Sequence, residues 1–296
     1  MKPIKTKELK DIVWEAVSCP FCGGNDSPIL LNKEPLRSGQ FDYKVHPVIC
    51  ECGLVYLNPR WSKETYSKFY TEYYDELYRL DDKEDYGVKG IMLHMKEVYS
   101  RCCDLCNFDK IKSIIDIGSG SGYGFDFLRE KTSADFFAIE SSLESQKKLE
   151  LNFVKVVDSS IEGDWSIKYE SFFDLCIMRH VVEHLLNPIE LLTKIRNTLS
   201  DSGYIYIAVP DMMNPRVNLR DYDKWWEYYF RSVHPFYYCK DTLFQLVQMC
   251  GLEVVSYGVV NEEVWVLACK NSIKKKYKKD NNLKQQQLDV LNRFLP

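Results

Sequence analysis

Between residues 111 and 270, short runs rich in β-branched and aromatic residues alternate with longer stretches in which apolar residues recur every three or four positions. The short runs predict strands and the longer stretches predict helices. Strands are expected at Ile111–Ile117, Asp135–Ile139, Phe153–Val157, Phe173–Met178, Tyr204–Val209, Leu252–Tyr257 and Val264–Cys269. Helices are expected at Tyr123–Lys131, Leu143–Leu151 and Pro188–Leu199, and from a cap at Asp241 to Cys250. This alternation predicts an α/β fold with a mostly parallel sheet and a closing antiparallel pair.

The pattern changes on both sides of this region. We divide the chain into a lead-in at 1–17, a cysteine-containing module at 18–60, a helical linker or cap at 61–108, the alternating domain at 109–270 with an aromatic insertion at 211–238, and a basic tail at 271–296. Ser62 is placed to cap the first helix of the linker. Leu288, Leu291 and Leu295 form a thin apolar stripe in the tail, which we interpret as a solvated end.

The charge distribution limits the kinds of molecule that the chain is expected to bind. The 296 residues carry a net charge of −4, but the segment from Lys270 onward is strongly basic, so the rest of the chain is clearly acidic. An acidic body is a poor surface for binding nucleic acid. Neither a long uncharged apolar run nor the apolar core of a signal peptide is present, so we expect a cytoplasmic protein without a membrane span.

One glycine-rich loop carries the clearest chemical signal. Residues Ile114–Ile117 form an apolar run that contains Asp116, and Gly118, Gly120, Gly122 and Gly124 follow at every second position before a helix. Glycines let the backbone approach a ligand closely. The spacing fits neither the dinucleotide-binding G-x-G-x-x-G pattern nor a phosphate-binding P-loop. An acid at the strand end suits a ligand with an amino group or a positive charge.

This stretch resembles the first motif of class I S-adenosylmethionine-dependent methyltransferases, D-x-G-x-G-x-G, and the resemblance covers about residues 95–270. It implies a Rossmann-like sheet. It also implies that Gly118, Gly120 and Gly122 bring backbone to the methionine portion of S-adenosylmethionine and that Asp116 organises the loop. Glu140 would then bind both ribose hydroxyls. Asp158 would take the adenine amino group, or would simply cap the following helix.

Eleven cysteines are unusual for a chain without an export signal, and four of them form two pairs. Cys19 and Cys22 are followed by Gly23-Gly24, and Cys50 and Cys52 are followed by Gly53. Two such knuckles predict a structural zinc ion held by four thiolates. His46 is a substitute ligand, and four reduced packing cysteines are the alternative. Cys102, Cys103 and Cys106 lie at helical spacing, and we interpret them as packing residues.

Together with the segment Gly53–Arg60 and the aromatic helix after it, these cysteines extend the resemblance to methyltransferases with an N-terminal zinc-binding module. Many of those enzymes act on nucleotide-linked sugars or other small metabolites. The resemblance therefore implies a small-molecule substrate, most readily a sugar in surface-polysaccharide or natural-product biosynthesis.

The reacting groups are expected after the strand that ends at Met178. The sequence His180-x-x-Glu183-His184 follows it. The pattern matches inverted zincin proteases, but its place after a sheet strand argues against that interpretation. Ubiquinone-type O-methyltransferases have a metal-binding E-x-x-E-H at this place. This chain has His180 in the first position, so whether it binds a magnesium ion here stays open. A base is needed for methyl transfer, and the candidates are His184, then His180, then His234, with Glu183 as orienting group or ligand.

The insertion is dense in aromatic residues that would cover a cleft and stack on a sugar. The candidate substrate-binding residues there are Trp225, Trp226 and Tyr229, with Tyr70, Tyr73 and Tyr74 closing the cleft from the linker. Two other functions stay open at this point. One is an rRNA or tRNA methyltransferase with a zinc module, against which the acidic body argues. The other is a non-enzymatic zinc-ribbon adaptor with a vestigial methyltransferase fold.

Overall fold

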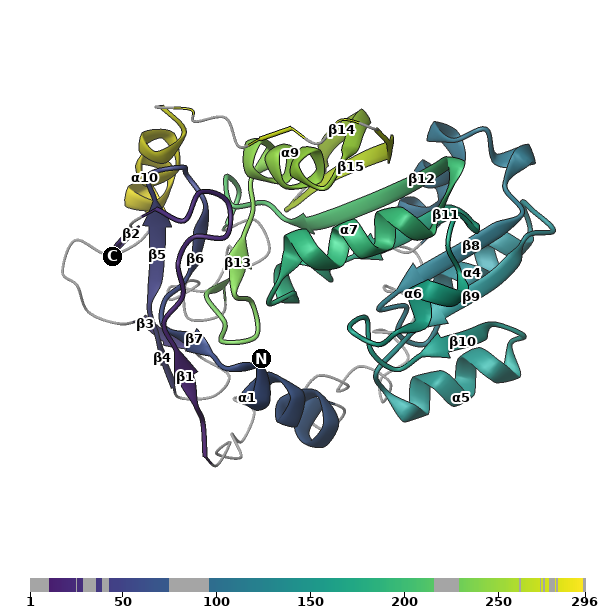
Figure 1. Ribbon diagram of the computed structural model, residues 1–296, viewed down its shortest axis with the longest axis horizontal. Coiled ribbons are helices and arrows are strands. Elements are labelled where there is room, and N and C mark those ends of the chain that lie inside the picture. The colour runs from purple at the N-terminus through teal and green to yellow at the C-terminus, as the bar shows by residue number, and fades with distance from the viewer. Residues whose placement is uncertain are drawn as a thin grey trace.

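The computed structural model describes most of the chain. The described residues are 11–24, 26–28, 36–38, 43–74, 96–215, 229–260, 262–271, 273, 275–276, 280 and 282–294. Within them, two parts lie side by side: a small β-rich module built from N-terminal residues, and a larger domain around one long sheet (Figure 1). No helix among these residues is both long enough and apolar enough to cross a bilayer.

The larger domain contains a seven-stranded sheet in the order β10-β9-β8-β11-β12-β15-β14. The strands are β8 (Ser113–Ile117), β9 (Asp135–Ile139), β10 (Lys155–Asp158), β11 (Phe173–Arg179), β12 (Leu199–Pro210), β14 (Leu252–Val260) and β15 (Glu263–Lys270). β15 is antiparallel to both of its neighbours, whereas the pairs among β8 to β12 are parallel. The predicted mostly parallel α/β sheet with a closing antiparallel strand is confirmed. Its strand order reverses direction between β8 and β11, and a ligand site is expected at that point.

The sheet is covered on both faces, which explains why its strands read as continuous apolar runs. Cys176 and Met178 of β11 pack into one core cluster, and Leu175 and Ile177 pack into another. The covering helices are α4 (Tyr123–Arg129), α5 (Leu143–Leu151), α6 (Trp165–Lys168), α7 (Pro188–Thr198), α9 (Lys240–Met249) and a helix over residues 96–105. Cys102 and Cys106 are buried in the second cluster, in agreement with a packing role.

Two predicted boundaries are wrong for local reasons. The strand expected from Phe153 begins at Lys155, because Phe153 has a φ of 56° and its N–H bonds the carbonyl of Glu150 in the turn after α5. The helix expected to be capped by Asp241 is capped by Cys239, whose backbone N–H donates to the hydroxyl of Thr242. Asp241 instead lies in the first turn.

The N-terminal module is a small antiparallel sheet in the order β13-β6-β5-β2. Its strands are β2 (Asp26–Pro28), β5 (Pro47–Cys50), β6 (Val55–Leu57) and β13 (Phe236–Tyr237). Two further pairs are β1 (Trp14–Glu15) with β7 (Arg60–Trp61), and β3 (Leu36–Ser38) with β4 (Tyr43–Val45). β13 belongs to the insertion at 211–238, so a strand from the larger domain completes the sheet of the module. The two parts share a core, in which Leu54 and Tyr56 pack with Phe236.

The linker begins with α1 (Lys63–Lys68), which continues into the π-helix η1 (Phe69–Tyr73). Ser62 caps α1 as predicted, since its hydroxyl accepts a hydrogen bond from the N–H of Thr65. Phe69 is buried together with Trp61 and Tyr66, and Tyr70, Tyr73 and Tyr74 pack against this cluster.

The interpretation of the tail as a solvated end is wrong for its last described segment. α10 (Leu283–Phe294) lies beside β5 (Figure 1), and Leu283 and Leu291 are buried among apolar residues of the module. Gln287 is fully buried and its amide donates to the carbonyl of Gly53. The apolar stripe therefore docks the helix onto the module.

Candidate active site

The predicted glycine loop connects β8 to α4 at the edge where the strand order reverses. Gly118, Gly120 and Gly122 have φ values of 73°, 57° and 77°, a region that residues with a side chain rarely adopt. A Cβ on Gly118 would lie 2.7 Å from Val181, and one on Gly122 would lie 2.5 Å from Leu149. A Cβ on Gly120 would have no atom of the described residues within 4 Å. Among these residues Gly120 therefore faces open space, where a ligand can approach the backbone.

Asp116 is buried on β8 and accepts a hydrogen bond from the hydroxyl of Tyr99. Burial raises the pKa of Asp116 to about 7, although the hydrogen bond from Tyr99 lowers it. Tyr99 comes from the helix at 96–105, and its ring lies so close to Gly124 that a side chain there would clash. The fourth glycine of the loop thus makes room for the ring that holds Asp116, a partner that the sequence analysis missed.

Glu140 follows β9 and lies against the same loop. Its Oε2 accepts a hydrogen bond of 2.8 Å from the N–H of Gly120, and its Oε1 accepts one of 2.9 Å from the N–H of Ser142. The carboxylate is buried and adjacent to the open face of the loop. Asp158 lies at the end of β10, where its Oδ1 accepts from the N–H of Ser160 in a turn. The expected cofactor residues therefore occupy the ends of three adjacent strands.

The chain after β11 brings His180 to the same edge. His180 has a φ of 53°, and its Nε2 lies 2.7 Å from Oε1 of Glu263. Glu263 is buried at the start of β15 and also bonds Arg179. Glu263 was not expected from the sequence, although an acid at the head of an otherwise apolar strand is a usable signal. Its carboxylate holds the imidazole through Nε2.

Glu183 lies one turn further on, in the 3-10 helix η4 (Val182–His184). It is 2% exposed, and within the part of the chain that the structure describes neither carboxylate oxygen has a hydrogen-bond partner. Its Oε1 lies 3.8 Å from Nδ1 of His180. Burial raises the pKa of Glu183 to about 7.

His184 and His234 are packed against each other with ring centroids 4.5 Å apart. The hydroxyl of Tyr70 lies 2.9 Å from Nδ1 of His184. Burial lowers the pKa of His184 to about 3, with the charge of His180 acting in the same direction and the backbone of Val233 opposing it. Burial and the neighbouring His184 also lower the pKa of His234. Burial therefore favours the neutral form of both rings.

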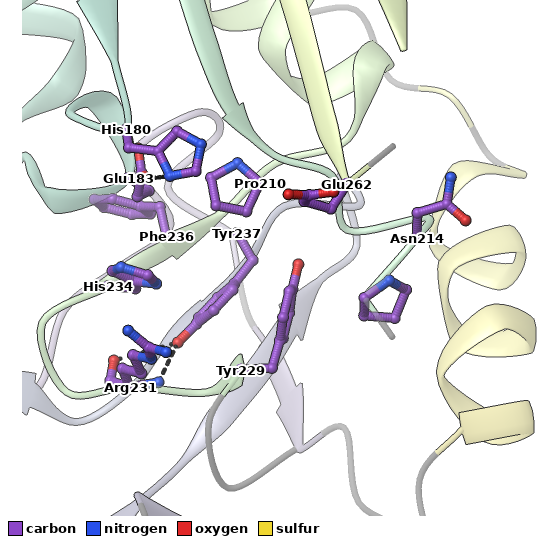
Figure 2. A pocket seen from close by; sticks show the side chains of 11 residues that line it. His180, Glu183, Pro210, Asn214, Tyr229, Arg231, His234, Phe236, Tyr237 and Glu262 are labelled. Carbon is purple, nitrogen blue, oxygen red and sulfur yellow. Dashed lines mark hydrogen bonds and ion pairs between the residues drawn. The ribbon is translucent and has the colours of Figure 1, made fainter. Parts of the chain in front are cut away.

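A cleft with about 760 Å³ of empty space opens beside these groups (Figure 2). Its lining residues are His180, Glu183, Pro210, Asn214, Pro215, Tyr229, Arg231, His234, Phe236, Tyr237 and Glu262. Of the predicted substrate residues, Tyr229 lines the cleft. Tyr70, Tyr73 and Tyr74 are not among its lining residues; they pack in the linker cluster, where the hydroxyl of Tyr70 contacts His184. Trp225 and Trp226 lie outside the described residues.

The four cysteines of the two knuckles converge as expected, with all sulfur atoms within 4.8 Å of one another. Cys19 and Cys52 have sulfurs 3.5 Å apart, and Cys22 and Cys50 have sulfurs 3.4 Å apart. A disulfide is far shorter, whereas thiolates around zinc are separated by about 3.8 Å. His46 is not part of the cluster.

Backbone groups also point at these sulfurs, as in a zinc knuckle. The N–H of Gly24 donates to the sulfur of Cys22 at 3.4 Å. A hydrogen bond from Cys52 lowers the pKa of Cys19 to about 6, while burial raises the pKa of Cys50 to about 12. The residues thus fit a tetrahedral metal site with four sulfur ligands.

Comparison with known proteins agrees with this geometry. A family model described as a methyltransferase domain matches residues 93–257, more than half of the chain. The chain belongs to this methyltransferase family. The match includes the glycine loop, Glu140 and His180, and it begins after the four cysteines. No curated protein matches the chain significantly.

Solved structures show the same methyltransferase fold at low sequence identity. The plantazolicin methyltransferase BpumL, solved with SAH, is 17% identical with a TM-score of 0.54, covering 70% of this chain and 94% of BpumL. The mitomycin 7-O-methyltransferase MmcR is 11% identical with a TM-score of 0.50, covering 70% of this chain and 66% of MmcR. A Thermotoga maritima methyltransferase described as a possible histamine N-methyltransferase is 16% identical with a TM-score of 0.48, covering 62% of this chain and 90% of that one. The family match and the similarity to BpumL confirm the expected class I methyltransferase fold.

Proposed function

We propose that this chain transfers the methyl group of S-adenosylmethionine to a hydroxyl of a small molecule, a nucleotide-linked sugar. The observation that carries the proposal is a juxtaposition at one sheet edge. The open loop at Gly120 with Glu140 suits the cofactor, and the His180–Glu263 pair faces a cleft that suits the acceptor. Because one fold can serve many different acceptors, the assignment of the acceptor depends on the side chains that line this cleft.

The cofactor supplies an electrophilic methyl group on a sulfonium, and the protein must align an acceptor oxygen and remove its proton. The Nε2–H of His180 donates to Glu263, so Nδ1 can take the hydroxyl proton as the new carbon–oxygen bond forms and the sulfonium becomes a thioether. We place His180 before His184 as the base, because His184 does not line the cleft and burial disfavours its protonation.

The walls of the cleft fit a sugar joined to a phosphate. Tyr229, Phe236 and Tyr237 offer flat apolar faces, on which sugar rings stack. Asn214 and Glu262 lie on the opposite side from His234 in Figure 2 and offer amide and carboxylate groups for hydroxyls. Arg231 adds a guanidinium group, which suits phosphate. Such acceptors occur in surface-polysaccharide and natural-product biosynthesis, the setting that the sequence resemblance implies.

Calorimetric titration with S-adenosylmethionine tests the cofactor assignment. We expect binding by the wild-type chain and at least 10-fold weaker binding by Glu140→Ala, with Glu144→Ala on the exposed face of α5 as the matched control. Equal affinity in both variants would contradict the site. A screen of nucleotide sugars, with S-adenosylhomocysteine as the detected product and folded RNA as the comparison acceptor, tests the substrate class.

We further propose that Cys19, Cys22, Cys50 and Cys52 hold one structural zinc ion. Three of these side chains are buried in a module with few strands, so the metal would supply much of its stability. We expect Cys52→Ser to lose one zinc equivalent per chain and to melt at a lower temperature. Cys103→Ser, in the helix at 96–105, should keep it. Unchanged zinc content in Cys52→Ser would refute the assignment.

A further inference from the structure

Glu183 presents an unusual problem for a buried residue. It is 2% exposed, and both of its carboxylate oxygens lack a hydrogen-bond partner among the described residues. Buried polar groups are almost always paired, since an unpaired one loses the hydration it had in the unfolded chain. Glu183 also lines the cleft. A cation bound beside it would satisfy both oxygens.

Two histidines from separate parts of the chain complete a set of ligands around this carboxylate. One nitrogen of His184, one nitrogen of His234 and one oxygen of Glu183 all lie within 4.8 Å of one another. His184 follows β11, whereas His234 belongs to the loop before β13. His180 is not a member of this set, and its Nε2 is bonded to Glu263. The cluster therefore differs from the motif-derived trio that the sequence suggested.

The surroundings of the cluster support ligation. The hydroxyl of Tyr70 lies 2.9 Å from Nδ1 of His184 and holds the ring, as the outer partners of metal-bound histidines do. The His184 ring also has a hydrogen bond with the backbone of Val233. A metal ion bound to His184 would replace that hydrogen bond. Glu183 and His234 line the cleft, so a metal held between them would face it.

We propose that Glu183, His184 and His234 bind a divalent transition-metal ion at the wall of the cleft. Two imidazoles and one carboxylate with open positions are a ligand set of zinc and non-haem iron sites. Magnesium instead prefers oxygen ligands and retained waters, so this set disfavours the magnesium ion considered from the sequence. If the proposed methyl transfer holds, the ion would bind an acceptor through neighbouring oxygens beside His180.

Cobalt titration of the zinc-loaded full-length chain tests the site. Cobalt added in that state should fill one further site per chain and give the visible bands of nitrogen and oxygen ligation without a thiolate charge-transfer band. We expect His234→Ala to lose this site and Glu183→Gln to weaken it at least 10-fold. His46→Ala, which removes an exposed histidine outside both clusters, should retain it.

Three results would overturn the proposal. The first is that the wild-type chain takes up no cobalt beyond the cysteine site. The second is that His234→Ala melts like wild type and still binds as much cobalt. The third is that magnesium competes with cobalt for the site as well as zinc does. S-adenosylmethionine titration of the same samples separates the two proposals. Cofactor binding without cobalt binding refutes only the metal site, and cobalt binding without cofactor binding refutes only the proposed methyl transfer.

Discussion

The imidazole of His180 and the carboxylate of Glu263 meet at 2.7 Å although 83 positions separate them in the sequence. β15 runs antiparallel to β12, so its first residue arrives at the edge where β11 ends. The φ of 53° at His180 turns its side chain toward that carboxylate, and such backbone strain persists where the surrounding structure fixes it. The pair therefore depends on both chain reversal and local strain.

Replacing Glu263 with Gln should reduce catalysis more than binding. The amide cannot stabilise a protonated His180 as a carboxylate does, so we expect kcat to fall about 10- to 100-fold. KM and the affinity for S-adenosylmethionine should change less than about threefold. Steady-state kinetics with the acceptor found in the sugar screen check this. Glu253→Gln, on the exposed side of β14, is the matched control, and Glu263→Asp should recover part of kcat. A rise in KM as large as the fall in kcat would assign Glu263 a structural role only.

Replacing Asp116 with Asn should make the stability of the chain less sensitive to pH. Because burial raises the pKa of Asp116 to about 7, the unfolded chain loses this proton more readily than the folded one. Its contribution to stability is therefore present below pH 4 and is lost as the pH rises through 7. Relative to wild type, Asp116→Asn should gain about 2 kcal/mol in unfolding free energy between pH 5 and 7.5. Urea denaturation at both pH values measures this.

The control for this comparison is Asp126→Asn, an exposed position in the first turn of α4. Its stability difference from wild type should stay constant over the same range. A constant difference for Asp116→Asn as well would show that the buried carboxyl is not protonated at neutral pH.

Replacing Gly122 with Ala should mainly lower stability, whereas replacing Gly120 with Ala should mainly weaken the binding of S-adenosylmethionine. At Gly122 the new methyl would lie 2.5 Å from Leu149, so the variant should lose about 2 kcal/mol or more of stability. At Gly120 the methyl meets no atom of the residues that the structure describes, so the backbone strain of about 1 kcal/mol should be the main cost to stability. We expect Gly120→Ala instead to weaken S-adenosylmethionine binding at least 10-fold. Thermal melts and calorimetry on both variants check this, and the reverse assignment of effects would contradict it.

Leu291 should stabilise the N-terminal module through α10. Its side chain is fully buried with Val55 and Leu57, so Leu291→Ala should cost about 2–4 kcal/mol. Asn292→Ala on the exposed side of α10 should cost less than about 0.5 kcal/mol. Denaturation followed by intrinsic fluorescence measures both. Equal stability of the two variants would mean that the docked helix contributes little.

Local patterns in the sequence predicted much of the cofactor half of the site. The run from Ile114 to Gly122 specifies a buried strand, a turn that requires positive φ and a helix start, all within a few residues. Glu140 and Asp158 were assigned through the resemblance to class I methyltransferases, and both lie at the same edge because parallel strands present their ends there. The cysteine knuckles are equally local, and their convergence confirms the expected cluster. The domain limits and the roles of these residues remain predictions.

The residues around the cleft are brought together by contacts between segments that lie far apart in the sequence. No local sequence pattern encodes such contacts. Glu263 reaches His180 only through the antiparallel course of β15, and His234 reaches His184 only because β13 joins the sheet of the module. Tyr99 was missed because its role depends on packing against Gly124. The sequence by itself therefore determined the fold class and the glycine loop, since these follow from periodicity and backbone conformation. Only the tertiary structure decided which histidine faces the cleft and which side chains surround Glu183, because those contacts arise when separate elements pack.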